Sequence, residues 1–485
     1  MKSDVSVLSR YPEYEATIGI EVHVQLTTKS KIFCTCANSI EHTPNVNICP
    51  ICTGHPGVLP VLNKEVITSA IKAGLATHST IAQTCTFARK HYFYPDLPKN
   101  YQITQSDDPI CINGFVPIHL EDGSIKKIHL IRIHMEEDAG KNIHSNFSNE
   151  SYVDLNRAGT PLLEIVSYPD ISNAYEAREY LKTLRLMVQY LGICSGNMEE
   201  GAFRADTNIS VRKKGATQLG TKCELKNINS FKFISDAIEY EVERQITSLE
   251  AGKKVLQETR LWNVKEGKTE VMRSKEEAAD YRYFTDPDLP IIKITQETLE
   301  SIKNNLPELP HERFERFIQK GLTPYEADIL INERELAAFY EQAAQLTSSK
   351  QLINWILRDF MKLLKDEKKA VHESKITPEH LAQLVALLDQ GAINNRAAQE
   401  VFALMAQTGQ EPHSIVKEKG LEQVGDIKEL ETLIQHIVEQ NPQQVAAYKA
   451  GQDKLFGFFV GQAMQKTKGK GNPQLINEIL KKYLT

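Results

Sequence analysis

The sequence predicts an α+β protein in which an antiparallel sheet domain is followed by helical domains. Residues 17–26 alternate apolar and polar side chains, which is typical of a half-buried strand. After residue 290 apolar residues recur at helical spacing, as in 351–364. We expect a sheet domain over 1–292, an all-helical domain over 293–391 and a helical tail domain over 392–485.

The strand predicted at 17–26 carries Glu21 and His23 on its polar face. On a single strand this pair is most simply a solvated surface, because antiparallel sheets often have one face in water. The same alternation recurs in 128–136, 152–156, 206–212 and 222–226, and these polar faces are rich in acidic residues, His, Asn and Arg. Such side chains hold Mg²⁺ and phosphate, so we expect the floor of an active site. The candidate metal ligands are Glu21, His23, Glu136 and Asp206, and the candidate phosphate ligands are Arg204 and Lys226.

Helices are expected at 65–77 and 174–191 in the first domain. Thr323-Pro324-x-Glu326 has the form of a helix start with proline in the first turn. Further helices are expected at 379–388, 394–407, 443–465 and 474–483, with a short loop between 407 and 443.

Cys34, Cys36, Cys49 and Cys52 form two close pairs, C-x-C and CPIC. Four thiolates in two pairs suit a tetrahedral zinc ion, although the first pair is tighter than usual. Free or redox-active thiols are the alternative interpretation. The other four cysteines are expected to be buried and inert.

Residues 87–105 interleave aromatic and basic side chains, a composition that suits stacking on unpaired bases and contact with phosphates. The alternative is a loop that packs on its own domain. The candidate nucleic-acid ligands here are Arg89, Lys90, Tyr92, Tyr94, Lys99 and Tyr101.

The formal net charge of −6 argues against nonspecific coating of nucleic acid. Residues 441–485 nevertheless hold seven lysines and two acidic residues, so local RNA contact by Lys466, Lys468 and Lys470 is expected, with a solvated tail as the alternative. No run of 18 apolar residues and no signal-peptide pattern is present, and we expect a bacterial cytoplasmic location.

Several longer segments together resemble the B-subunit family of the aspartyl/glutamyl-tRNA(Asn/Gln) amidotransferases. They are IGIEVHVQL (18–26), HPGVLPVLN (55–63), KHYFYPDLPKNYQITQ (90–105), HMEEDAGK (134–141), DLNRAGTPLLEIV (154–166), NMEEGAFRADTNISVR (197–212), KCELKNINSF (222–231), RSKEEAADYRYFTDPDLP (273–290) and VGQAMQKTKGKGNPQLINEIL (460–480). The sequence departs from the family pattern at Ala88, where Asp is common, and at Ala205, where Cys is common.

The resemblance implies a cradle-shaped first domain that uses ATP and Mg²⁺ to phosphorylate the side-chain carboxylate of Glu-tRNA(Gln) or Asp-tRNA(Asn). Ammonia would come from an amidase (A) subunit, in a heterotrimer with a small C subunit. The aromatic loop and the lysine-rich tail would bind the tRNA, and which of the two tRNAs is the substrate stays open. No Walker-type loop is present, so the ATP site would be of an uncommon type. A tRNA-binding scaffold without chemistry is the main alternative; a self-contained glutamine amidase would need a nucleophile paired with a base, which the sequence does not suggest.

Overall fold

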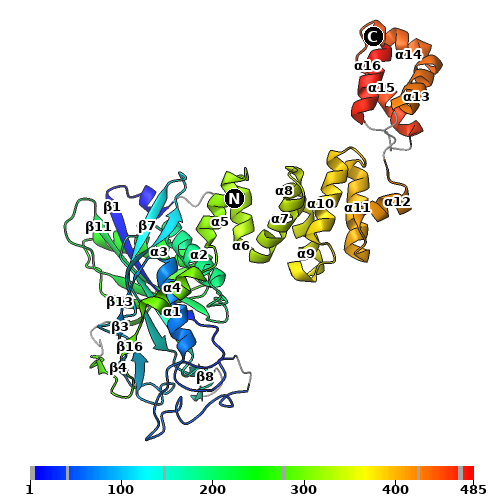
Figure 1. The fold of residues 1–485 in the computed structure, drawn as a ribbon. Helices are drawn as coiled ribbons and strands as arrows, with labels where there is room; N and C mark the ends of the chain where they lie inside the picture. Colours follow the sequence, from blue (N-terminus) through cyan, green and yellow to red (C-terminus); the bar gives the residue numbers. More distant parts are fainter. Residues whose placement is uncertain are drawn as a thin grey trace. The chain divides into compact units, whose positions relative to one another are not determined.

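A computed structural model describes residues 6–39, 43–145, 149–274, 280–422, 427–467 and 473–484. It divides into two compact units, Met1–Arg313 and Phe314–Thr485. Strands in the first unit and helices in the second confirm the predicted α+β class (Figure 1). The domain boundaries expected at 292/293 and 391/392 stay predictions.

The first unit is organised around a nine-stranded sheet in the order β14-β13-β12-β11-β1-β10-β7-β6-β2. Its strands are β1 (Tyr14–Gln25), β2 (Thr80–Ile81), β6 (Cys111–His119), β7 (Ile125–Glu137), β10 (Pro161–Ser167), β11 (Phe203–Lys213), β12 (Cys223–Ile228), β13 (Glu258–Asn263) and β14 (Lys268–Ser274). Smaller sheets hold β3 (Thr84–Cys85), β4 (Ala88–His91), β5 (Tyr101–Thr104), β8 (Lys141–His144), β9 (Ser151–Asp154), β15 (Phe284–Thr285) and β16 (Ile292–Lys293).

Strand β1 confirms the strand predicted at 17–26, since every second residue along it is buried. Ile18, Ile20, Val22 and Val24 are at most 1% exposed and belong to the core of the first unit. The opposite face of β1 is partly buried and polar. The sheet therefore separates an apolar core from a polar floor.

Helices α1 (Lys64–Ala76), α2 (Ala174–Tyr190) and α3 (Phe231–Glu250) contribute their buried residues to that core. The helices expected at 65–77 and 174–191 are thereby confirmed. Helix α3 connects β12 to β13, and those two strands are parallel. The sheet expected to be antiparallel contains this parallel pair, because a helical crossover returns the chain in the same direction.

The strand predicted at 152–156 forms as β9 (Ser151–Asp154), but it does not join the main sheet, so its expected place in the polar floor is wrong. Strand β9 pairs with β8 in a separate two-stranded sheet. The Asp154 carboxylate accepts a hydrogen bond from the backbone N–H of Asn156 at 3.0 Å. Asp154 therefore shapes a loop and is not part of the polar floor.

Helices dominate the chain from residue 296 onward, and one segment among them, η3, is π-helical. In chain order they are α4 (Gln296–Asn304), α5 (Pro310–Gln319), α6 (Pro324–Asn332), α7 (Arg334–Leu346), α8 (Gln351–Asn354), η3 (Trp355–Phe360), α9 (Met361–Glu367), α10 (Pro378–Asp389), α11 (Asn395–Thr408), α12 (Pro412–Lys419), α13 (Ile427–Gln440), α14 (Pro442–Lys449), α15 (Leu455–Lys466) and α16 (Pro473–Leu484). The start predicted at Thr323 is confirmed, with a complete capping box to Glu326.

Two expectations for the C-terminal helices are wrong. The helix predicted over 443–465 is interrupted, because Gly451 adopts a φ of +98° between α14 and α15. The loop expected between 407 and 443 contains α12 and α13. Helices α13, α15 and α16 share a small core that includes Leu430, Phe459 and Leu480.

No helix in the described ranges has both the length and the apolar composition that a membrane span requires.

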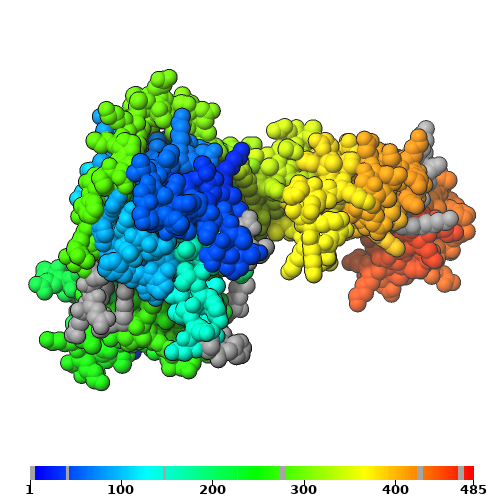
Figure 2. All heavy atoms as spheres, turned by 90° about the horizontal axis from the view of Figure 1, so that it is seen from below, coloured from blue at the N-terminus to red at the C-terminus, as the bar shows by residue number. Residues whose placement is uncertain are grey.

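The blue, cyan and green parts of the first unit form one continuous body in the space-filling view (Figure 2).

Candidate active site

The pairing of four strands places four polar residues in one row across the polar face of the sheet. His23 on β1 lies opposite Arg204 on β11 and opposite Glu164 on β10. Glu164 in turn lies opposite His134 on β7. Because directly opposed residues of antiparallel strands point to the same side, the row Arg204–His23–Glu164–His134 faces one surface.

Glu164 lies at the centre of this row and contacts both imidazoles. His23 Nε2 is 3.4 Å from Glu164 Oε2 and 3.5 Å from Glu136 Oε1. His134 Nε2 is 3.4 Å from Glu164 Oε2 and 3.6 Å from Glu136 Oε2. Glu136 and Glu164 are 2% and 6% exposed, so these carboxylates are almost removed from water.

Two groups of side chains in this cluster have the composition of a metal site. One group is Glu21, His23 and Glu164, and the other is His134, Glu136 and Glu164. Within each group the ligand atoms lie within 4.8 Å of one another. The carboxylates suit a divalent cation such as Mg²⁺ or Mn²⁺, whereas imidazole is a more usual ligand of transition metals. The carboxylates therefore fit the metal that the sequence led us to expect.

Burial and neighbouring charges shift the pKa values of the side chains in this cluster. Burial and the charge of Glu164 raise the pKa of Glu21 to about 7. Burial acts to lower the pKa of His134, but Glu164 and Glu136 outweigh it and raise that pKa to about 9. Burial acts to raise the pKa of Glu164, but His134 and His23 outweigh it and hold that pKa well below its usual range. Glu21 is thus the carboxylate whose charge is disfavoured here, and a bound cation would favour its ionised form.

The predicted ligands are distributed differently from the expected single set. Glu21 and His23 group with Glu164, whereas Glu136 groups with His134 and Glu164. Sequence reasoning missed Glu164, whose signal was a lone acid within the apolar run of 161–167.

Asp206 lies opposite Glu21 in the sheet but belongs to neither group. Its carboxylate pairs with Lys226 Nζ at 2.7 Å, and Lys226 also lies 3.2 Å from Glu224. Arg204 pairs with Asp138 at 3.0 Å. Lys226 and Arg204 therefore lie beside the cluster as paired cations, and their phosphate contacts stay predictions.

The aromatic and basic segment packs on its own domain over much of its length. Arg89 forms ion pairs with Asp286 at 2.8 Å and Asp288 at 2.7 Å, and its guanidinium lies 4.4 Å from the centre of the Tyr101 ring. Lys99 pairs with Glu137. These contacts favour the packing alternative for Arg89, Lys99 and Tyr101.

Other members of the segment are oriented differently. Glu136 raises the pKa of Lys90 above its usual value against the effect of burial, so the Lys90 ammonium is close to the carboxylate cluster. Burial raises the pKa of Tyr92, with Glu136 as a further cause. Tyr94 is 55% exposed and is available to an external partner.

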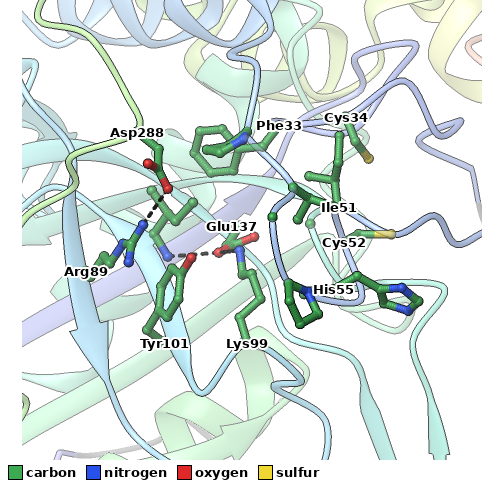
Figure 3. A pocket seen from close by; sticks show the side chains of 17 residues that line it. Phe33, Cys34, Ile51, Cys52, His55, Arg89, Lys99, Tyr101, Glu137 and Asp288 are labelled. Atoms are coloured by element: carbon green, nitrogen blue, oxygen red, sulfur yellow. Dashed lines mark hydrogen bonds and ion pairs between the residues drawn. The ribbon is translucent and has the colours of Figure 1, made fainter.

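A pocket of about 260 Å³ lies beside the ion pairs Arg89–Asp288 and Lys99–Glu137 and extends to Cys34 and Cys52 (Figure 3). Arg89, Lys99 and Tyr101 line one part of it, and Cys34 and Cys52 line another. Its lining combines charged side chains such as Glu137 with apolar ones such as Phe33, as is usual for a small-molecule site.

Cys34, Cys36, Cys49 and Cys52 bring their four sulfurs within 4.8 Å of one another. A hydrogen bond from the Cys34 thiol is the largest cause that lowers the pKa of Cys52 to about 5. Four sulfurs at this separation fit a structural metal ion such as zinc. The remaining cysteines, Cys85, Cys111, Cys194 and Cys223, are buried as expected.

Lys466 ends helix α15 and is exposed. Lys468 and Lys470 lie outside the described residues. The contribution of the lysine-rich tail to RNA binding stays a prediction.

Comparison with known proteins identifies the family. Residues 16–300 match the family model described as the GatB/GatE catalytic domain, and residues 338–484 match the one described as the GatB domain. The chain belongs to the GatB family. The carboxylate–histidine cluster lies entirely within the segment matched as catalytic.

The curated relatives agree over nearly the full length. The chain is 49% identical to a protein of Thermodesulfovibrio yellowstonii over 474 residues, covering 97% of this chain and 99% of the relative. It is 49% identical to one of Persephonella marina and 50% identical to one of Myxococcus xanthus, again over 97% of this chain and at least 99% of each relative. All three relatives are named as the B subunit of aspartyl/glutamyl-tRNA(Asn/Gln) amidotransferase. The resemblance inferred from the sequence is confirmed.

Proposed function

We propose that this chain is the B subunit of a tRNA-dependent amidotransferase and carries its ATP-dependent activating step. The substrate would be Glu-tRNA(Gln), Asp-tRNA(Asn) or both. ATP would phosphorylate the side-chain carboxylate of the misacylated amino acid, and ammonia would then displace phosphate to form the amide. The names of the curated relatives support the substrate class.

The observation that carries the chemical part is the cluster centred on Glu164. A scaffold that only binds tRNA has little use for two nearly buried carboxylates facing two imidazoles. Phosphoryl transfer needs positioned cations and few covalent groups, because the charge develops on phosphate oxygens.

In this proposal Glu21, His23 and Glu164 hold one divalent cation, and His134 and Glu136 with Glu164 offer a second position. Bound Mg²⁺ supplies positive charge to the phosphates of ATP. The same carboxylates raise the pKa of Lys90 against the effect of burial, and Lys90 would contribute positive charge to a bound phosphate. Arg204 and Lys226, now paired with Asp138 and Asp206, would exchange a carboxylate for phosphate when ATP binds.

The partners proposed are those that the family resemblance implies. Ammonia would come from glutamine hydrolysed by an amidase (A) subunit, with a small C subunit completing a heterotrimer in the bacterial cytoplasm. Tyr92, Tyr94 and Lys90 are the members of the aromatic segment best placed to meet the acceptor end of the tRNA. Lys466 and the lysines beyond it would bind the tRNA body. The four-cysteine cluster would hold one zinc ion.

The test uses the complex purified from its host, supplied with ATP, ammonium chloride and misacylated tRNA. Glu164→Gln and Glu21→Gln should each lower amide formation by about a hundredfold or more. Their tRNA affinity should stay within a few fold of the unmodified complex.

Glu15→Gln is the matched control, because Glu15 lies on the same face of β1 but pairs with Arg212 away from the cluster. It should retain amide formation. If Glu164→Gln forms the amide as fast as this control, the cluster has no part in the chemistry, and the scaffold alternative is favoured.

A further inference from the structure

Lys31 is a basic residue with no exposure to solvent, which is uncommon for lysine. Its aliphatic stem passes close to Gly159, where an added Cβ would lie 3.5 Å from Lys31 Cδ and 3.6 Å from Cys52 Cβ. The whole side chain, including the ammonium, is therefore enclosed by protein. A buried ammonium is costly unless it is paired and hydrogen bonded.

The surroundings of the ammonium contain few partners. Lys31 Nζ donates to the backbone carbonyl of Asn47 at 2.9 Å and to Cys52 Sγ at 3.8 Å. Cys52 Sγ also accepts the backbone N–H of Cys49 at 3.1 Å. Among the described residues no Asp or Glu forms an ion pair with Lys31. The sulfur cluster is thus the source of any compensating negative charge.

This geometry discriminates between the states of the cluster. Without a metal ion the cluster supplies at most the one negative charge of Cys52, whose pKa is lowered to about 5, and two disulfides would supply none. Four thiolates around one divalent ion carry a net charge of about −2. An adjacent ammonium offsets part of that charge, and the thiolates in turn offset the cost of burying the ammonium.

We propose that Lys31 is the built-in counter-charge of the metal–thiolate cluster formed by Cys34, Cys36, Cys49 and Cys52. Lys31 favours the deprotonated, metal-bound state over neutral thiols and orients Cys52 through an N–H···S contact. The proposal rests on metal binding at the cluster and is independent of the ATP chemistry proposed above. Groups just outside a metal's ligands commonly tune its affinity in this way.

The test compares zinc affinity in the full-length chain, assembled with its partner subunits, by competition with a chromophoric chelator at fixed pH. Lys31→Met removes the charge and keeps much of the stem, and zinc affinity should fall by about 10–100-fold. Lys31→Gln keeps an N–H donor without the charge, and zinc affinity should fall similarly. Lys29→Met is the control, because Lys29 is exposed two residues away.

Each outcome decides the proposal. Zinc affinity of Lys31→Met within about twofold of Lys29→Met would overturn it, and so would wild-type affinity in Lys31→Gln, since the charge would then be irrelevant. Less than about half an equivalent of zinc in the unmodified protein would also overturn it, without bearing on the ATP site. If Lys31→Met does not fold, Lys31→Gln carries the same comparison. Thiolate-to-cobalt absorption after Co²⁺ substitution gives a readout independent of amide formation.

Discussion

Lowering the pH from about 8 to about 6 should weaken binding of a divalent cation at the polar face of the sheet. Burial and Glu164 raise the pKa of Glu21 to about 7, so this carboxylate is protonated below neutral pH. Glu21 must lose its proton to act as a ligand, and protons therefore compete with the metal. The sign follows from the raised pKa: affinity is retained above about pH 7 and lost below it.

The magnitude can be worked from that pKa. With a pKa of about 7, Glu21 is about nine-tenths ionised at pH 8 and about one-tenth ionised at pH 6. One competing proton therefore weakens the metal by about tenfold, or about 1.4 kcal/mol. His23 belongs to the same group of ligands, and its pKa is raised because Glu164 and Glu136 outweigh the effect of burial, so its proton adds to the weakening at the acid end of the range.

The assay is Mn²⁺ binding followed by electron paramagnetic resonance, because Mn²⁺ occupies oxygen-rich magnesium sites. The dissociation constant is measured at several pH values for the unmodified complex and for Glu21→Gln. The variant should bind more weakly and lose the roughly tenfold part of the pH dependence that Glu21 contributes, keeping only the part that comes from His23. Equal affinity of the unmodified complex at both ends of the range would refute the assignment of Glu21 as a metal ligand.

Three further predictions use other parts of the chain. Protein purified without chelator should hold about one zinc per chain, and less than about half an equivalent would favour free or redox thiols. Glu241→Ala should lower the free energy of unfolding, measured by denaturant titration, by about 3–5 kcal/mol. The reason is that fully buried Glu241 is paired with Arg244 at 2.6 Å and lies 3.5 Å from Arg260. A loss below about 1 kcal/mol would contradict this. Truncation after Leu421 should weaken tRNA binding and flatten its salt dependence by about 0.7–0.9 for each phosphate that is no longer bound, and an unchanged affinity and slope would leave the tail without a role.

The period-two patterns predicted the sheet well because each pattern is local. In β1 the alternation of buried and partly buried residues follows directly from the sequence of apolar and polar residues. Capping of α6 was equally readable from Thr323 and Glu326. The parallel pairing of β12 and β13 could not be predicted from the sequence, because the direction of β13 depends on how helix α3 returns the chain to the sheet.

The helical tail illustrates the same limit in the other unit. A glycine within an apolar periodic stretch is compatible with a continuous helix, and only the backbone at Gly451 reveals the break. A truncation after residue 410 would remove α12, whose Ile415 and Val416 are buried. The structure places a more suitable cut beyond that helix.

The sequence predicted a polar, acidic site on the sheet, but it did not predict every residue of that site. Glu21 and His23 were recognisable because a polar face on one strand is visible in one strand's sequence. Glu164 could not be recognised from the sequence, because the residues on both sides of it in its strand are apolar. Its proposed role depends on His23 and His134, which are 141 and 30 positions away in the sequence. Only the register of the sheet brings these residues together. A shift of β10 by one residue would turn Glu164 into the apolar core, so the register that buries Leu163 and Ile165 on one face also fixes the carboxylate on the other. The folding of the core and the assembly of the cluster are therefore one event, and a substitution that weakened this strand pairing should lower metal affinity even where it touches no ligand.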